Sequence, residues 1–491
     1  MSMRPLPVPE VPESTARVAR VAFPRGCLAM RIRDELGAVF ENERFASAFP
    51  RRGGPAVPLG TLAMVSVLRY AERLTDRQAA DAVRSRIDWK CALSLQLTDP
   101  GFDYWVLSEF RDRLITHNLG QQILDAILER CAELGLLRAG GRVRTDATHV
   151  IACVRDLNRL ELCTETMRCA LEALAVVAPS WLTTTDALCP HWVERYRQRA
   201  DSYRLPKGEA ERGRFAENVG GDGFELLDAL AEPTAPAHLA DLDAVRTLRT
   251  VWAQEYLRDT SGVRWRERKE RPPGAERIVS PHDVDARCGV KRQTAWDGYK
   301  LHLSESCDED LPHLMLLAAT APASTDGHQL TGAVHQHLVE RDLAPNEYLV
   351  DGGYTSARLL LEARTAGIEL TGPVRPSPGP PGLPGGYTTA DFTIDWDQRS
   401  ATCPRGANSS RWIDTTIRGE PRIHVDFADA DCPKCLLKHR CTRAAYRVLT
   451  LPPREEWEVL QQRRAQLNTD AWKERYRTRA GVEGSISQAK A

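Results

Sequence analysis

Hydrophobic residues recur at helical spacing through the first part of the chain. Apolar side chains stand three and four residues apart, and one segment opens on Thr75 and Asp76, which are favourable residues at a helix start. The predicted helical segments are 57–74, 74–86, 107–114 and 121–137. The region from 56 to 138 is therefore expected to be an all-helical domain.

The period changes after Gly140 and Gly141. Val143, Thr145 and Ala147 alternate with Arg144, Asp146 and Thr148. Alternation of this kind is typical of a strand, here one with an acidic tip at Asp146. Residues 155 to about 275 then return to a helical pattern, with Trp181, Trp192, Tyr196, Trp252 and Tyr256 as expected anchors.

Residues 264–300 form a locally basic stretch that begins as "RWRERKERPPGAER". Its prolines and charges indicate an exposed linker or loop. Contact with DNA and an ordinary charged surface are equally good readings of such a patch.

An α/β rhythm occupies residues 296–375. Strand patterns in "GYKLHLSES" and "LMLLAATAPA" precede a helix in 326–342. Next comes a strand, "NEYLVD", that ends in the acid Asp351. It is followed by a helix in 357–367 and the strand "IELTGPV". This order predicts a mixed sheet flanked by helices. The loop that follows is rich in proline and glycine, the block 390–450 has short alternating runs, and a helical segment closes the chain.

The totals describe a globular protein of several modules. The chain has 491 residues, of which 42% are hydrophobic and 27% charged, and the formal net charge is −1. A length of this order exceeds one ordinary core. The net charge carries no global signal for nucleic acid, so any polyanion must meet local patches. Because no apolar run is long enough for a membrane span and the Pro-rich start lacks a signal core, we expect a cytoplasmic protein with no membrane partner.

Thirteen cysteines in such a chain argue against a disulfide framework. Nine are scattered among apolar residues as small hydrophobes, whereas Cys403, Cys432, Cys435 and Cys441 stand apart. Two close thiols and two more can form a tetrahedral zinc site, with His439 or His424 as a substitute ligand. A reduced metal-free cluster and a redox role are the alternatives.

The last sixteen residues, "YRTRAGVEGSISQAKA", contain a polar cluster at helical spacing. Tyr476, Arg479, Glu483 and Lys490 share one face of an α-helix. By itself this pattern is typical of a solvated surface stripe.

Asp146 and Asp351 give Glu483 a chemical context. Asp351 follows the apolar "YLV" and precedes Gly352 and Gly353, which allow a tight turn and close approach of a ligand. An acid that merely ends a strand is the alternative for either aspartate. Three carboxylates without histidine or thiolate suit Mg²⁺ or Mn²⁺, and such ions can drive phosphodiester transfer. The cationic and phenolic neighbours of Glu483 would then contact phosphates.

These motifs, taken in order, resemble the DDE-class insertion-sequence transposases. "LTDRQAADAVRSRIDWKCALSLQLTDPGFDYWVLSEFRDRL" resembles their helical N-terminal domain, "RTDATHV" and "YLVDGGYTS" their two aspartate strands, and "AWDGYKLHLSES" the intervening core strand. "YRTRAGVEGSISQAK" matches the tyrosine–arginine–glutamate–lysine signature of one branch, and the cysteine block resembles a subgroup with a cysteine-bearing insertion. The resemblance covers residues from about 56 to the end.

The resemblance implies an α/β fold with an RNase H-like core and a transposase activity. Asp146, Asp351 and Glu483 would bind Mg²⁺ or Mn²⁺ and catalyse cleavage and strand transfer, while Tyr476, Arg479 and Lys490 would contact transposon-end DNA. Zn²⁺ at the four cysteines would be structural. The expected partners are terminal inverted repeats, target DNA and a second copy of the chain, in a cytoplasmic, nucleoid-associated setting. Lys300, His302 and Asp326 lie in segments that also resemble the family and receive no catalytic role.

The expected domain order follows the same motifs. It comprises an N-terminal arm (1–55), a helical domain for end recognition or assembly (56–138), the first core strand (139–154), a helical insertion (155–278), the core with Asp351 (279–375), the linker and cysteine-bearing insertion (376–452), and the C-terminal helix (453–491).

Members of the family usually continue beyond the signature lysine, whereas here one residue follows Lys490. We therefore expect a truncated C-terminus, with Glu483 and Lys490 weakly held because a terminal turn frays. An inactive DNA-binding relative is one alternative function, and another metal-dependent nuclease or phosphatase is a second.

Overall fold

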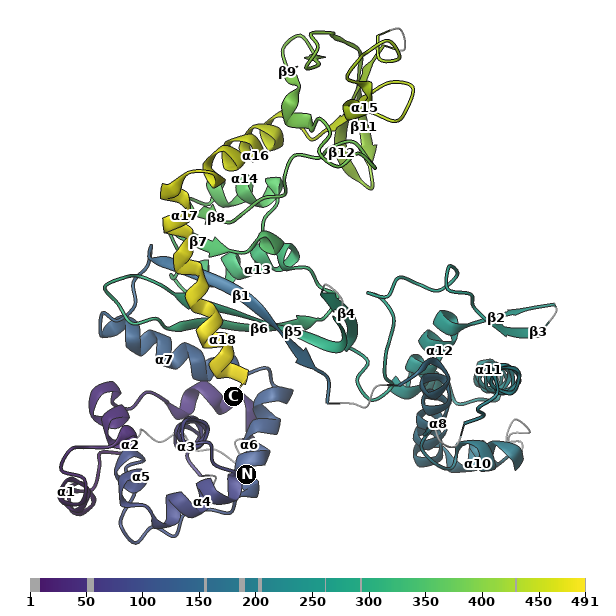
Figure 1. The fold of residues 1–491 in the computed structure, drawn as a ribbon. Coiled ribbons are helices and arrows are strands. Elements are labelled where there is room, and N and C mark those ends of the chain that lie inside the picture. Colours follow the sequence, from purple (N-terminus) through teal and green to yellow (C-terminus); the bar gives the residue numbers. More distant parts are fainter. Residues whose placement is uncertain are drawn as a thin grey trace. The chain divides into compact units, whose positions relative to one another are not determined.

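The computed structural model describes residues 9–50, 57–153, 157–184, 190–201, 205–260, 262–291, 294–428 and 431–490. Two compact units divide the chain. One contains Met1–Val143, Glu305–Leu317 and Leu338–Asn346, and the other contains Arg144–Ser304, Ala318–His337 and Glu347–Ala491. Figure 1 labels their helices and strands.

Helices dominate the first unit, as the apolar spacing predicts. They are α1 (Glu13–Ala22), α2 (Leu28–Arg31), α3 (Leu59–Ala71), α4 (Asp76–Ser85), α5 (Ile87–Ala92), α6 (Trp105–Thr116) and α7 (Gln121–Glu133). The predicted start of α4 is confirmed, because Thr75 and Gln78 form a reciprocal capping box. The predicted segments 57–74, 74–86, 107–114 and 121–137 correspond to α3, α4, α6 and α7.

The core of this unit also recruits residues for which the sequence predicted no element. Phe40 and Phe45 are buried against Leu62, Trp89 and Phe110. Phe45 lies in a 3-10 segment, η2 (Asn42–Ala48), and the short π segment η1 (Ile32–Leu36) precedes it. Elements this short contain too few turns for a period to show in the sequence.

A six-stranded mixed sheet is the centre of the α/β part. Its strands are β1 (Arg142–Ile151), β4 (Arg287–Lys291), β5 (Thr294–Ser306), β6 (Met315–Pro322), β7 (Glu347–Val350) and β8 (Glu369–Thr371). The order is β4-β5-β1-β7-β8, with β6 also paired to β5. β7 and β8 run parallel, whereas β4 and β5 run antiparallel. The predicted mixed sheet is thus confirmed.

The helices α13 (Gly327–Val339) and α14 (Ala357–Thr365) occupy the positions that the α/β rhythm predicts. α14 connects the parallel strands β7 and β8, which is the usual route between neighbouring parallel strands. The neighbouring positions of β1 and β7 place the strands that carry Asp146 and Asp351 side by side.

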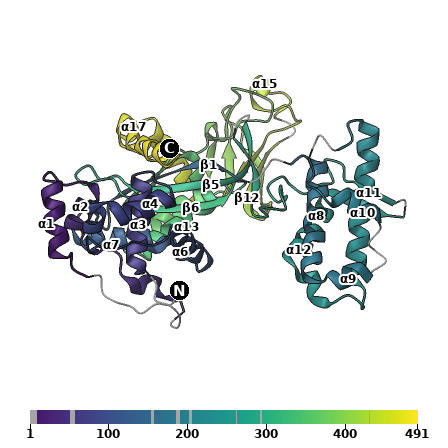
Figure 2. The same cartoon turned by 90° about the horizontal axis from the view of Figure 1, so that it is seen from below.

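The insertion after β1 is a helical bundle, seen from another side in Figure 2. Its elements are α8 (Arg159–Val177), α9 (Pro179–Thr184), α10 (Pro190–Tyr196), α11 (Glu209–Ala231), η3 (Ala237–Asp241) and α12 (Asp243–Glu255). Within the described ranges, no helix is both long enough and apolar enough to cross a membrane.

The helical prediction for residues 155–275 is wrong at its end. Tyr256 begins β2 (Tyr256–Asp259), which pairs antiparallel with β3 (Gly262–Trp265). Tyr256 is still buried, as expected of an anchor. The alternation of apolar and polar residues over these few positions suits a hairpin, and Gly262, at φ 122°, takes a backbone conformation that favours glycine.

Close packing in the bundle depends on Gly223 of α11. A Cβ built at this position would lie 2.1 Å from the ring of Trp252, and the Trp252 indole donates a hydrogen bond to the carbonyl of Gly220 at 2.9 Å. The glycines therefore let the indole lie directly on the helix backbone.

The buried carboxylate of Glu165 links α8 to two other segments of the chain, one at Ala200 and one at His282. Glu165 of α8 accepts hydrogen bonds from Arg168 at 2.8 and 3.1 Å and from the amide of Ala200 at 3.0 Å, and its Oε1 lies 2.8 Å from Nε2 of His282. Burial opposes ionisation of Glu165, but the hydrogen bonds from Arg168, Ala200 and His282 outweigh it and lower the pKa to about 2.

This network predicts a pH-dependent stability. Because the pKa of Glu165 is lower in the folded chain than in the unfolded one, its stabilisation is present above about pH 4.3 and is lost as the pH falls toward 2. Glu165→Gln is expected to lower the free energy of unfolding by about 3 kcal/mol at neutral pH, with the difference from the parent chain shrinking in acid. Urea unfolding at several pH values measures this, and a difference that does not vary with pH would contradict it.

The cysteine-bearing block is mainly a small antiparallel sheet followed by the C-terminal helices. Its elements are β9 (Thr393–Asp395), β10 (Ser400–Thr402), β11 (Ser409–Ile417), β12 (Glu420–Phe427), α15 (Lys438–Cys441) and β13 (Val448–Leu451), then α16 (Arg454–Leu467), α17 (Asp470–Arg477), η6 (Thr478–Gly481) and α18 (Val482–Lys490). β12 is the central strand, between β11 and β13. Phe392, Val425, Phe427 and Trp457 contribute to its core.

Candidate active site

Asp351 lies where the sequence predicts it, directly after a buried strand. Tyr348, Leu349 and Val350 of β7 are fully buried. The Asp351 carboxylate then accepts a hydrogen bond from the amide of Gly353 at 2.8 Å and so caps the 3-10 turn η4 (Gly352–Tyr354). This capping holds one oxygen of the carboxylate at the mouth of the turn.

Asp146 occupies the neighbouring strand, but not its tip. β1 continues to Ile151, so the predicted strand end at Asp146 is wrong. The Asp146 carboxylate accepts a hydrogen bond from the amide of Ala147 at 2.7 Å. Asp146 and Asp351 line the same groove, which lies within one compact unit of the chain.

Arg479 links the strand acid to the helix acid. Its Nη2 lies 2.9 Å from Oδ2 of Asp146, and its Nη1 lies 3.5 Å from Oε1 of Glu483. The Arg479 side chain is 13% exposed, whereas that of Glu483 is 66% exposed. One buried guanidinium therefore bridges two of the three predicted acids.

The closing segment is not the single α-helix that the face pattern assumed. A 3-10 turn, η6, separates α17 from α18. Arg144 of β1 donates a hydrogen bond to the Thr478 carbonyl at 2.7 Å, and a Cβ at Gly481 would lie 2.1 Å from Arg144 Nη1. Gly481 therefore makes room for the guanidinium that fixes the turn against β1. Sequence reasoning missed Arg144, because an arginine in an alternating strand resembles an exposed position.

Tyr476 faces the sheet. Its hydroxyl donates a hydrogen bond to the carbonyl of Val350 at 3.0 Å, and its ring stacks on Trp472 with 4.6 Å between centroids. Burial raises the pKa of Tyr476 to about 12, so the phenol remains a donor at neutral pH. The bond anchors α17 one residue before Asp351. Lys490 is the last residue of α18, and its side chain lies outside the described part of the chain.

Burial disfavours ionisation of Asp146. Burial raises the pKa of Asp146, and the charge of Asp351 adds to this, while the Ala147 amide and Arg479 oppose it. A neighbouring cation favours the ionised form of Asp146, and the Arg479 guanidinium is such a cation. Carboxylate oxygens without thiolates are the donor set that Mg²⁺ and Mn²⁺ prefer, so these residues fit a divalent ion.

The three carboxylates are nevertheless not drawn together as ligands of one ion. Among the described residues, Glu165, Cys169 and His282 are the one set of three or more such side chains whose ligand atoms all lie within 4.8 Å of one another. Arg168 pairs with Glu165 there and occupies the carboxylate, so that set is the buried ion network of the insertion.

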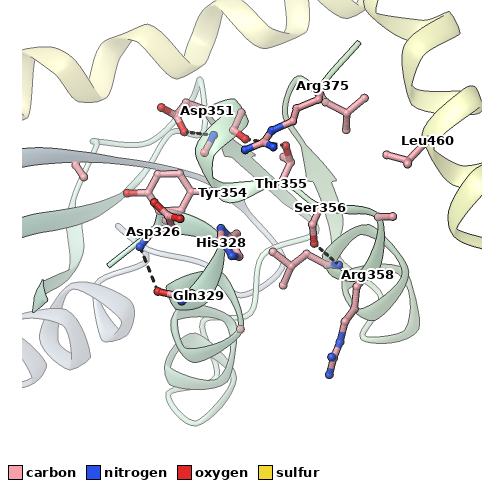
Figure 3. A pocket seen from close by; sticks show the side chains of 18 of the residues that line it. Asp326, His328, Gln329, Asp351, Tyr354, Thr355, Ser356, Arg358, Arg375 and Leu460 are labelled. Atoms are coloured by element: carbon pink, nitrogen blue, oxygen red, sulfur yellow. Dashed lines mark hydrogen bonds between the residues drawn. The ribbon is translucent and has the colours of Figure 1, made fainter. Parts of the chain in front are cut away.

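His302 and Tyr354 form a second buried pair beside the acids. His302 Nδ1 lies 2.5 Å from the Tyr354 hydroxyl, and burial lowers the pKa of His302 to about 4, which keeps the imidazole neutral. The neighbouring Lys300 donates a hydrogen bond to the Thr325 carbonyl at 2.6 Å. These contacts agree with the non-catalytic interpretation of His302 and Lys300, while Asp326 lies at the groove wall (Figure 3).

The four cysteines of the insertion come near one another without forming a compact ligand set. Cys403, Cys432 and Cys441 pack against the core of the small sheet. Burial raises the pKa of the Cys441 thiol, and the other three cysteines add to the shift. No three of these described thiols, with or without His424 or His439, have ligand atoms within 4.8 Å. Zinc here stays a prediction, which the metal content of the parent chain and of Cys432→Ser would measure.

Comparison with known families identifies the chain. Residues 402–491 match a family model described as a transposase DDE domain, and residues 24–113 match one described as a transposase domain. These matches indicate an insertion-sequence transposase of the DDE class. No curated protein and no solved structure matches it.

Some candidate residues of this transposase lie inside the matched segments, and others lie outside them. Tyr476, Arg479 and Glu483 lie inside the DDE match, as do the four cysteines. Asp146 and Asp351 lie outside both matched segments, so their assignment depends on the fold, which pairs Asp146 with Arg479 and places Asp351 after the neighbouring strand. DNA is the partner that a transposase implies.

Proposed function

We propose that this transposase cleaves and joins DNA strands at the site formed by Asp146, Asp351 and Glu483, with Mg²⁺ or Mn²⁺ bound by these acids. The observation that carries the proposal is the Arg479 guanidinium bridging Asp146 and Glu483. It brings the C-terminal helix to the strand acid, and it marks the place where positive charge is favourable.

Each residue then has a distinct task. Asp146 supplies a half-buried carboxylate from β1, Asp351 supplies a half-buried one directly after the neighbouring strand β7, and Glu483 supplies a more exposed one from α18. A bound divalent ion would activate water or a 3′-hydroxyl and stabilise the leaving oxygen. Arg479 would leave the carboxylates to contact a phosphate when DNA and metal bind, as a guanidinium pairs well with phosphate oxygens. Tyr476 and Arg144 hold the helix that carries Glu483.

The wider assignment follows the sheet. Neighbouring strands that carry acids, with helices between strands, support an RNase H-like core. The helical domain at 56–138 and the insertion at 155–278 are the surfaces that we assign to recognition of inverted repeats and to assembly, with a homodimer as the working unit. Lys490 remains a proposed contact to the transposon end.

Incubation with DNA that carries the element's own ends tests the proposal. The parent chain with Mg²⁺ or Mn²⁺ is expected to nick that DNA, and Asp146→Asn, Asp351→Asn and Glu483→Gln are expected to bind it without nicking. Equal nicking by all four proteins would overturn the assignment of these acids. DNA binding without cleavage by the parent chain would instead assign it a non-catalytic role at transposon ends.

A further inference from the structure

The groove that begins at the acids extends to the cysteine-bearing insertion. Its volume is ≈ 1170 Å³, and it lies within one compact unit. Asp146 and Asp351 line one part, Arg375 and the start of α14 line the middle, and β12, β13 and α16 line the rest. Figure 3 shows Arg375 pointing toward the turn that bears Asp351, with Leu460 of α16 across the groove.

Two arginines in this groove carry charges that no carboxylate neutralises in the described structure. Arg464 of α16 donates from Nε to the Arg375 carbonyl at 3.1 Å, while its Nη1 is buried and has no hydrogen-bond partner among the described residues. Burial lowers the pKa of Arg464, and no charged neighbour opposes that shift. The Arg375 side chain is exposed and forms no ion pair with any residue that the structure describes.

The other arginines of the groove differ, because acids already hold them. Arg358 pairs with Glu362 at 2.7 Å, and Arg422 of β12 lies 3.8 Å from Glu456. In Figure 3 the Arg358 side chain points away from Asp351. Among the arginines that line the groove, Arg375 and Arg464 are therefore the two without an acidic partner in the described structure.

A partly buried guanidinium without an acid is costly unless a ligand completes it. The groove is open, so the missing partner can come from outside. Arginines without an acidic partner, in the groove that also holds the proposed metal-binding carboxylates, suit a phosphodiester chain, because phosphates pair with arginine.

We propose that Arg375 and Arg464 bind consecutive phosphates of the DNA backbone beside the bond to be cleaved, so that α16 and the loop after β8 form one wall of the substrate groove. The proposal rests on the proposed function, since it extends the same site. The hydrogen bond between Arg464 and the Arg375 carbonyl holds the Arg464 side chain beside the Arg375 backbone. Such a contact would carry no direct sequence information, because it is made to phosphate.

Fluorescence anisotropy of the full chain tests this, with a fluorescein-labelled DNA duplex of mixed sequence in EDTA over a range of salt concentrations. For Arg375→Gln with Arg464→Gln, the plot of log Kd against log salt is expected to become shallower by about 2, one unit for each lost phosphate contact. Arg375→Gln alone, at an exposed position, is expected to give about half this change, and Arg464→Lys is expected to retain the slope.

Arg454→Gln is the matched control. Arg454 lies on the same helix but pairs with Asp397 at 3.0 Å and Glu458 at 2.8 Å, so its loss is expected to leave the slope unchanged. A folded Arg375→Gln variant with the slope of the parent chain would overturn the proposal. Because the assay contains no divalent ion and measures no cleavage, its result is separate from that of the nicking experiment.

Discussion

Exchange of Asp351 for Asn is expected to slow metal-dependent cleavage of transposon-end DNA by about a thousandfold or more. The variant keeps the shape of the side chain and the oxygen that accepts the Gly353 amide, but it loses the charge that would hold a divalent ion. Charge stabilisation by such an ion contributes several kcal/mol in the transition state, and about 4 kcal/mol corresponds to a thousandfold in rate. Single-turnover cleavage of end-labelled DNA measures this.

Asp326→Asn is the matched control for that experiment. Asp326 is an exposed acid on the wall of the same groove, shown beside Tyr354 in Figure 3. Its substitution removes the same charge without touching the proposed ligands, so the rate should change by only a few-fold. If both variants lost the same fraction of the cleavage rate, cleavage would depend on the total negative charge of the groove, and Asp351 would not be a specific metal ligand.

The helical insertion should lose most of its stability when Glu255 is replaced. Glu255 is fully buried, and its carboxylate lies 2.5 Å from Arg159, 2.5 Å from Arg271 and 2.8 Å from the Gln254 amide. Glu255→Ala leaves two guanidinium groups without their acid, and breaking a buried pair in this way costs about 3–5 kcal/mol. Tryptophan fluorescence during urea unfolding follows the change through Trp252 and Trp265.

Asp228→Asn supplies the comparison for Glu255. Asp228 pairs with Arg258 at 2.5 Å on the surface of the same insertion, where both side chains are about half exposed. An exposed pair contributes little. A midpoint as low for Asp228→Asn as for Glu255→Ala would show that burial is not the source of the effect.

The fold was predictable where a period persists long enough to be read. The helices α3, α4, α6 and α7 and the rhythm from β5 to β8 followed from apolar spacing. Short elements were not predicted. β4 spans five residues with a central Gly289, and the hairpin of β2 and β3 follows a helix without a break. In such segments tertiary pairing, and not local pattern, decides the structure.

The acids of the candidate site could be predicted from the sequence, but the residues that hold the surrounding elements in place could not. A local sequence pattern points to these residues: Asp351 follows an apolar strand, and Arg479 and Glu483 stand at helical spacing. Arg144 and His302 act through residues distant in the sequence, namely Thr478 and Tyr354, and no spacing within one segment reports such contacts. The resemblance to a family assigned the three acids to one site, whereas in the fold Arg479 bridges Asp146 and Glu483 and the three carboxylates are not gathered as ligands of one ion.

Anomalous diffraction from crystals soaked in Mn²⁺ tests whether Asp146 and Asp351 bind a divalent ion, because it locates the ion without any assay of activity. We expect a manganese peak within bonding distance of the Asp146 and Asp351 carboxylates, with Arg479 moved away from Asp146, and no such peak in Asp351→Asn. Manganese absent from these carboxylates, with Arg479 still paired to Asp146, would contradict it.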